Sequence, residues 1–358
     1  MNARLEKKLR LLAVIVTASM IGAAIYSFAT TRDIAVGLLY GLLISAPLAG
    51  ISLFVLEGPM RVWLGGLSFT ATLMVRSAIY ATIIVPILFF QLGSVIAGFA
   101  RDPSNKSLWI DIAYSVACVV LVNLVLGITN IIGPRAFLNF ILGRYHTPIE
   151  EKRFVLFVDI AGSTGLAERL GGVAIHRLLD RTFRLLTLSV IDYRGEVLNY
   201  VGDEVIVTWR VAAKVSERRY LDCFFAIQDR IAAKADGYRT EFGLVPNFRA
   251  GLHAGPVVIS ECGDSRRQVA YFGDTMNVAA RLQEYCKQAG RALLVSGDLL
   301  RLVDPGRDLV VESLGPIALR GRAAAIEVFA VERRSPPPTG SHGNQVPTSS
   351  PEPSPSPA

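Results

Sequence analysis

The chain has 358 residues, which is long for one ordinary domain and predicts two. Its residues are 51% hydrophobic and only 19% charged, which excludes both a largely disordered chain and a purely soluble one. The charges are uneven, because residues 1–150 carry 11 Lys and Arg with 6 Asp and Glu, whereas residues 151–358 carry 26 and 24. The positive excess therefore indicates a membrane orientation signal, and no nucleic-acid partner is expected.

Four apolar stretches precede residue 134, and each is long enough for a helix of about 20 residues that crosses the hydrocarbon core. They run over Leu11–Thr30, Ile34–Leu56, Leu73–Phe99 and Leu108–Ile132. We therefore predict an α-helical membrane domain over residues 1–133. Pro86 lies inside the third stretch, where membrane helices tolerate a kink.

The flanking cations predict the orientation of this domain. Four precede the first stretch and four follow the last: Arg4, Lys7, Lys8, Arg10, Arg135, Arg144, Lys152 and Arg153. Both termini are therefore expected in the cytoplasm, in a multi-pass protein in contact with lipid of the cell membrane. Arg76 is expected to reach the cytoplasmic interface. Asp111, next to Trp109 near the outer interface, is expected to be solvated with a structural role only. The alternative is that Asp111, Asn123 and Asn130 form part of a sensing pocket or a helix contact.

Residues 134–152 form a connector. Phe137, Phe140, Ile141 and Tyr145 recur at roughly helical spacing, and Thr147-Pro148 should end the helix. Two interpretations remain open, a short dimer-forming helix that carries a signal to the cytoplasm and an amphipathic helix that lies on the membrane surface.

From Arg153 the pattern changes to mixed strands and helices, which predicts an α+β domain over residues 153–333. The expected elements, in order, are a strand to Asp159, helix 165–193, a hairpin with Gly202-Asp203 at its tip, helix 217–236, a strand at 247–255, helix 274–289 and three further strands. Residues 335–358 hold 8 of the 18 prolines, so the segment 334–358 is expected to be disordered.

Two acids follow apolar strands and could converge. Asp159 ends the first strand, and Asp203 lies in the hairpin turn. Mg²⁺ favours one or two carboxylates together with water and phosphate oxygens. Gly162, Ser163 and Thr164 then open a helix whose free N–H groups suit a triphosphate. Each feature alone is explained equally well by a helix cap or a turn.

Asn277 and Arg281 are spaced i,i+4 and therefore share one helix face. An amide and a guanidinium on one face can hold a ribose oxygen and a phosphate that gains charge in the transition state. By itself, the pair is explained better by a solvated helix face.

Five motifs in one order, FVDIAGSTGLAERLG, VGDEVIVTW, FRAGLHAGPVV, YFGDTMNVAARL and LRGR, resemble the catalytic domain of class III nucleotide cyclases, the adenylyl and guanylyl cyclase family. The connector together with the domain start is similar to membrane-anchored bacterial members. The resemblance covers about half of the chain and implies a cyclase-type α+β fold. It also implies a homodimer with active sites between two copies.

The resemblance assigns roles residue by residue. Asp159 and Asp203, with the Ile160 carbonyl, match the ligands of two Mg²⁺ or Mn²⁺ ions per site. Asn277 and Arg281 match the transition-state pair. Arg249 matches a basic residue that contacts the phosphates, and Arg320 stands where a phosphate-binding lysine is common. Together with Gly162, Ser163 and Thr164 of the helix start, they are the expected phosphate-binding residues.

The base-reading positions depart from the family pattern. Asn199 stands where a lysine is common, and Ala270 stands where an aspartate or threonine is common. Asn199 can still hydrogen-bond a purine, whereas the Ala270 side chain cannot. Because Asn199 is not acidic, ATP is favoured over GTP, and an adenylate cyclase that forms cyclic AMP is expected. A guanylyl cyclase remains the alternative.

Two rival functions belong to other classes. The string VGDEV resembles the turn of diguanylate cyclases, but that family leaves the Asn277 and Arg281 motif unexplained. The chain could also be a membrane receptor whose cyclase-like domain binds nucleotide without turnover. No Ser/His/Asp or Cys/His arrangement accompanies these motifs, and the four cysteines lack CxxC spacing.

Overall fold

The computed structural model describes residues 3–56, 60, 67–89, 107–132, 143–211, 218–264, 268–318 and 324–334. It divides into two compact units. One unit comprises Met1–Ile149 with Ile259–Ala270, and the other comprises Glu150–Val258 with Tyr271–Ala358. Arg320, residues 133–142 of the expected connector helix and the expected disordered tail after residue 334 lie outside the described residues.

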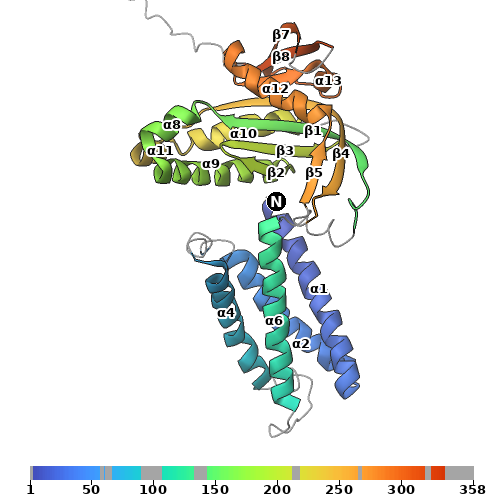
Figure 1. The fold of residues 1–358 in the computed structure, drawn as a ribbon. Coiled ribbons are helices and arrows are strands. Elements are labelled where there is room, and N and C mark those ends of the chain that lie inside the picture. The colour runs from blue at the N-terminus through green and yellow to red at the C-terminus, as the bar shows by residue number, and fades with distance from the viewer. Residues whose placement is uncertain are drawn as a thin grey trace, which may run out of the picture. The chain divides into compact units, whose positions relative to one another are not determined.

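The first unit contains four long apolar helices (Figure 1). Their bounds are α1 (Ala3–Thr31), α2 (Ile34–Gly50) continued by the π-helix η1 (Ile51–Leu56), α4 (Phe69–Phe89) and α6 (Ser107–Ile132). Each contains a segment long and apolar enough to cross a membrane, as the sequence predicts. The third helix begins at Phe69 instead of Leu73, because the Ser68 hydroxyl accepts a hydrogen bond from the Ala71 N–H and caps it.

Small residues bring two of these helices together. A Cβ atom added at Gly37 would lie 2.5 Å from the Ala23 carbonyl oxygen, and one added at Gly41 would lie 2.6 Å from Met20 Cα. α2 therefore lies with its backbone directly against α1, as small residues allow between helices in membranes. On α6, Asn123 is 3% exposed and donates to the Val119 carbonyl of its own helix. The side chains of Asp111 and Asn130 lie outside the described residues.

The second unit is built on a sheet in the order β2-β3-β1-β4-β6-β8-β7, with β5 paired to β4 (Figure 1). The strands are β1 (Ile149–Ile160), β2 (Glu196–Val201), β3 (Glu204–Arg210), β4 (Phe248–Cys262), β5 (Gln268–Phe272), β6 (Leu293–Ser296), β7 (Leu309–Ile317) and β8 (Ile326–Arg333). β3 runs antiparallel to both β1 and β2, and β6 runs parallel to β4. The mixed α+β fold is as predicted, whereas β5 was not expected.

The first strand begins at Ile149 and not at Arg153. The sequence places this polar start in the connector, but in the structure two of its side chains are buried. Arg153 is 5% exposed and donates to Glu151, which is 7% exposed, over 2.9 Å. It also forms a longer ion pair of 3.4 Å with Glu196 on β2. Because these buried charges neutralise one another, the polar segment can extend the strand.

The helices are α8 (Ser163–Leu170), α9 (Gly172–Asp192), α10 (Arg219–Ala232), α11 (Ala235–Phe242), α12 (Asp274–Ala289) and α13 (Gly297–Leu300). The predicted single helix 165–193 is wrong, because Gly171 adopts φ +80° and separates α8 from α9. The expected helix 217–236 is likewise two helices, α10 and α11. α12 ends as predicted at Gly290, which adopts φ +64°.

Two helical layers cover the sheet. Along β6, Leu293 and Val295 belong to the larger core, which includes residues of α9 and α10, whereas Leu294 belongs to a smaller core with Val278 and Leu282 of α12. Successive side chains of a strand point to opposite faces. α12 therefore lies on the face of the sheet opposite to α9 and α10 (Figure 1).

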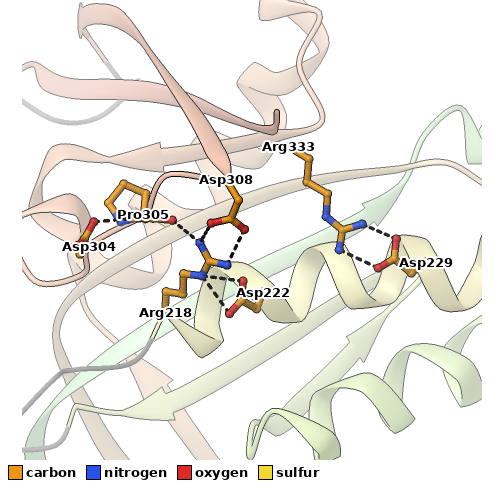
Figure 2. A network of polar contacts seen from close by, with 8 residues as sticks. Arg218, Asp222, Asp229, Asp304, Pro305, Asp308 and Arg333 are labelled. Atoms are coloured by element: carbon orange, nitrogen blue, oxygen red, sulfur yellow. Dashed lines mark hydrogen bonds and ion pairs between the residues drawn. The ribbon is translucent and has the colours of Figure 1, made fainter. Parts of the chain in front are cut away.

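Ion pairs attach the C-terminal strands to α10, as Figure 2 shows. Arg218 at the start of α10 donates to both carboxylate oxygens of Asp308 and, over 2.6 Å, to the Pro305 carbonyl. Arg333 at the end of β8 forms a two-pronged pair with Asp229 of α10, at 2.5 and 2.7 Å. Both ion pairs lie at the same end of the antiparallel pair β7 and β8, where Leu309 is opposite Arg333, and they hold this end to α10.

Candidate active site

The structure brings the two predicted acids into contact. Asp159 lies near the end of β1, directly opposite Glu204 in the antiparallel ladder with β3. Asp203 lies immediately before β3, in the turn where Gly202 adopts φ +63°. The pairing of β1 with β3 therefore places both carboxyl groups at one end of these strands, where they hydrogen-bond to each other.

The electrostatics of the pair differ between its two members. Burial raises the pKa of Asp159 to about 7, and the hydrogen bond to Asp203 adds to this rise. Burial also tends to raise the pKa of Asp203. Hydrogen bonds from Asp159 and from the Ser163 hydroxyl outweigh that effect and lower it. The two groups titrate together, and Asp159 is the member whose pKa is raised.

A helix start and a cation lie beside the pair. Gly162 adopts φ +76° and precedes α8, which has no acidic residue in its first turn. The Ser163 hydroxyl donates to Asp203. On β4, the positive charge of Arg249 opposes the rise in the pKa of Asp159. The free N–H groups at the start of α8, which include those of Ser163 and Thr164, suit an anion.

The geometry fits a divalent cation. No group of three or more His, Cys, Asp or Glu side chains that could hold a metal occurs within the described ranges. Mg²⁺ needs only one or two carboxylates, because water and substrate phosphates complete its shell. Two carboxyl groups that share a proton form such a set, since a cation can replace that proton. The Ile160 side chain is apolar and buried, so only its backbone carbonyl could join the two carboxyl groups as a ligand.

Asn277 and Arg281 lie elsewhere on the molecule, on the outer face of α12. The opposite face of this helix is buried against the sheet. Asn277 is exposed, and Arg281 pairs with Glu284 one turn further along, at 3.3 Å. Neither side chain forms a hydrogen bond or an ion pair with Asp159 or Asp203 in the part of one copy that the structure describes.

The two base-reading positions are on different strands. Asn199 is exposed on β2, where an irregularity in the pairing with β3 begins. Its side-chain oxygen accepts a hydrogen bond of 2.9 Å from the Tyr200 N–H. Ala270 is half-buried on β5.

One acid near the site is not among the residues that the sequence analysis selected. Burial raises the pKa of Glu204 to about 7, and the charges of Asp203 and Glu284 add to the effect. The signal available from sequence was its position directly after Asp203. The side-chain role of Ser163 was also missed, because the sequence suggested only its backbone N–H as a ligand.

At one end of β1 and β3, the structure therefore combines paired carboxyl groups, a helix N-terminus and an arginine. This is the chemistry of a site for a phosphorylated ligand with a divalent cation. Residues 147–333 match the Adenylate and Guanylate cyclase catalytic domain. The chain belongs to this family.

Individual relatives agree with the family match. Adenylate cyclase 2 of Rhizobium meliloti (strain 1021) is 34% identical over 239 residues, which cover 66% of each chain. Adenylate cyclase 1 of the same strain is 30% identical over 184 residues, 49% of this chain and 27% of the relative. Among solved structures, a bacterial light-regulated adenylyl cyclase matches with a TM-score of 0.53 at 22% identity, over 64% of this chain and 66% of the other, and so shares the fold.

Proposed function

We propose that this chain is a membrane-bound adenylate cyclase that converts ATP to 3′,5′-cyclic AMP and pyrophosphate at sites shared by two copies. The observation that carries the proposal is the contact between Asp159 and Asp203 beside Arg249, in a domain of the cyclase family. The names of the two Rhizobium relatives support ATP as the substrate.

In this reaction, the ribose 3′ oxygen bonds to the α-phosphorus while the bond from that phosphorus to the pyrophosphate oxygen breaks. Asp159 and Asp203, with the Ile160 carbonyl, are the residues that would hold two Mg²⁺ or Mn²⁺ ions. Such ions lower the pKa of a bound hydroxyl and stabilise the leaving oxygens. The contact between the two acids supports a cation site at this position.

The remaining residues bind and orient the triphosphate. The N–H groups that open α8, at Ser163 and Thr164 after Gly162, point where an anion is stabilised by the helix dipole. Arg249 on β4 adds a fixed positive charge next to the carboxyl pair. Arg320 is proposed as a second phosphate contact on the strength of the motif alone, since it lies outside the described residues.

A second copy supplies the transition-state pair. Asn277 and Arg281 are accessible on α12, and among the described residues of their own copy neither forms a hydrogen bond or ion pair with Asp159 or Asp203. With one catalytic domain per chain, a two-fold dimer would place them at the partner's acids and create two equivalent sites. Asn277 would orient the ribose, and Arg281 would stabilise charge on the phosphoryl oxygens in the transition state.

The hydrogen bond at Asn199 supports adenine over guanine. Because its oxygen already accepts from the Tyr200 N–H, the NH₂ group is the part of the side chain that is fully free for a base. Adenine N1 accepts such a donor. The N1–H and N2 groups of guanine require an acceptor, and the Ala270 side chain has none.

We also propose that the four apolar helices anchor the enzyme in the cell membrane with both termini in the cytoplasm. The cations that flank the first and last helices support this orientation. The catalytic domain would then face the cytoplasmic pool of ATP.

The test is turnover by the purified full chain in detergent or lipid nanodiscs, with ATP and GTP offered separately and with Mg²⁺ or Mn²⁺. Cyclic AMP from ATP is expected, and product analysis separates it from a cyclic dinucleotide. Cyclic GMP alone would assign a guanylyl cyclase. No cyclic product from a dimeric, folded preparation would overturn the enzymatic proposal in favour of a nucleotide-binding receptor.

A further inference from the structure

The helix that bears Asn277 and Arg281 lies unusually close to the strand beneath it. A Cβ atom added at Gly251 of β4 would lie 2.2 Å from the Ala279 carbonyl oxygen and 2.4 Å from the Gln283 N atom. One added at Gly255 would lie 2.4 Å from the Thr275 hydroxyl. Glycine at 251 therefore leaves room for the backbone of α12, and glycine at 255 leaves room for the Thr275 hydroxyl.

The two glycines belong to one face of the strand. They are four residues apart, and alternate residues of a strand face the same side. Their neighbours Ala250, Leu252 and Ala254 point to the other face, into the larger core. The sequence GLHAG thus presents two glycines, with His253 between them, on the face toward α12 and an apolar surface to the other layer.

Two side-chain hydrogen bonds fix the helix along this surface. At the N-terminal end, the Thr275 hydroxyl donates to the Pro256 carbonyl over 2.7 Å. At the C-terminal end, the Cys286 thiol contacts the Ala250 carbonyl at 3.3 Å. The first bond is the stronger of the two, because a thiol is a weak donor. Thr275 is 2% exposed, so water cannot replace it.

Thr275 also lies close in sequence to the exposed pair Asn277 and Arg281 on the same helix. It occupies the first turn of α12, two positions before Asn277, and the preceding Gly273 adopts φ +134°. The first turn of a helix has few backbone hydrogen bonds of its own. The side-chain hydrogen bond to Pro256 therefore fixes the first turn of α12 to β4.

We propose that Thr275 is a positioning residue that aligns Asn277 and Arg281 for the reaction, acting through its hydrogen bond to β4. This inference rests on the proposed function, because it assigns Thr275 to the α12 half of a shared site. Thr275 touches neither substrate nor metal. Removal of the Thr275 hydroxyl should lower the rate of the chemical step. It should leave the proposed cation site at Asp159 and Asp203 intact.

The test compares Thr275→Val, which keeps the shape and removes the hydroxyl, with Thr275→Ser, which keeps the hydroxyl. In the full chain, Thr275→Val should lower kcat about ten- to a hundredfold with KM for ATP changed less than about twofold, as a small misplacement of reacting groups does. Thr275→Ser should retain a kcat near that of the unmodified protein.

Thr208→Val is the matched control. Thr208 is fully buried and donates to the Phe154 carbonyl over 2.9 Å, so the substitution removes the same kind of bond away from α12. It should lower the melting temperature without the selective loss of kcat. If Thr275→Val does not fold, Gly255→Ala displaces the same hydroxyl and should give the same split between kcat and KM.

Mixed dimers separate the positioning role from general damage. Thr275→Val should regain one intact site when paired with Asp159→Ala, and none when paired with Arg281→Ala. A normal kcat in Thr275→Val, an effect confined to KM, or rescue by Arg281→Ala would overturn the inference. If the unmodified chain makes no cyclic nucleotide, it is the proposed function that fails instead.

Discussion

Asp159 lies near the end of β1 and Asp203 in the turn before β3, and the antiparallel pairing of the two strands brings their carboxyl groups into a hydrogen bond with each other. Ionisation of both half-buried groups is unfavourable, and the charge of Arg249 only partly opposes the rise in the pKa of Asp159. The pair is therefore poised to exchange its proton for a cation.

Removal of either carboxylate should abolish the metal response. Asp159→Ala or Asp203→Ala is expected to reduce cyclic nucleotide formation below detection, because a single remaining carboxylate holds the cations too weakly. Thermal unfolding gives a readout independent of turnover. Mg²⁺ should raise the Tm of the unmodified chain and leave that of either variant unchanged. An Asp203→Ala protein that still responds to Mg²⁺ would exclude this pair as the metal site.

Cation binding should strengthen with pH. The folded, metal-free chain holds the Asp159 proton more tightly than the unfolded chain, since the pKa is raised to about 7 in the fold. Its contribution to stability is present at low pH and is lost as the pH rises through about 7. A cation offsets that loss, so the rise in Tm on adding Mg²⁺ should be larger at about pH 8 than at about pH 6. Equal shifts at both values would contradict a proton-for-cation exchange.

Complementation should reveal a shared site. An Asp159→Ala chain and an Arg281→Ala chain are each expected to be inactive as homodimers. Their heterodimer should recover up to half of the normal activity, because one of its two sites combines the intact acids of one copy with the intact α12 of the other. Differently tagged chains and two-step purification verify the heterodimer. Absence of recovery would place all these residues in one copy.

The buried cysteines should be inert in the native state. Burial raises the pKa of the Cys286 thiol to about 12 and raises that of Cys223 as well. Both thiols therefore stay protonated at pH 8 and do not act as nucleophiles. Alkylation followed by mass spectrometry should modify Cys262, which is half-exposed, and spare the other two until denaturant is added. Labelling of native Cys286 at the rate of Cys262 would show that α12 opens from β4.

The sequence was sufficient where a local pattern determines the outcome. Apolar length predicted the four long helices, and Gly202-Asp203 between alternating apolar residues predicted the hairpin. It was insufficient where a long-range contact overrides the local signal. Glu151 and Arg153 look like connector residues, and only the third partner on β2, Glu196, explains why they can be buried in a strand. Likewise, spacing placed Asn277 and Arg281 on one face but could not show that Thr275 fixes the helix.

β6 contributes consecutive residues to two separate cores, with Leu293 and Val295 on one side and Leu294 on the other. Neither helical layer can melt while the other keeps its full complement of partners, since both depend on the same short strand. The catalytic unit should accordingly lose its structure in a single step on heating, and a cavity on either side of the sheet should weaken the whole domain.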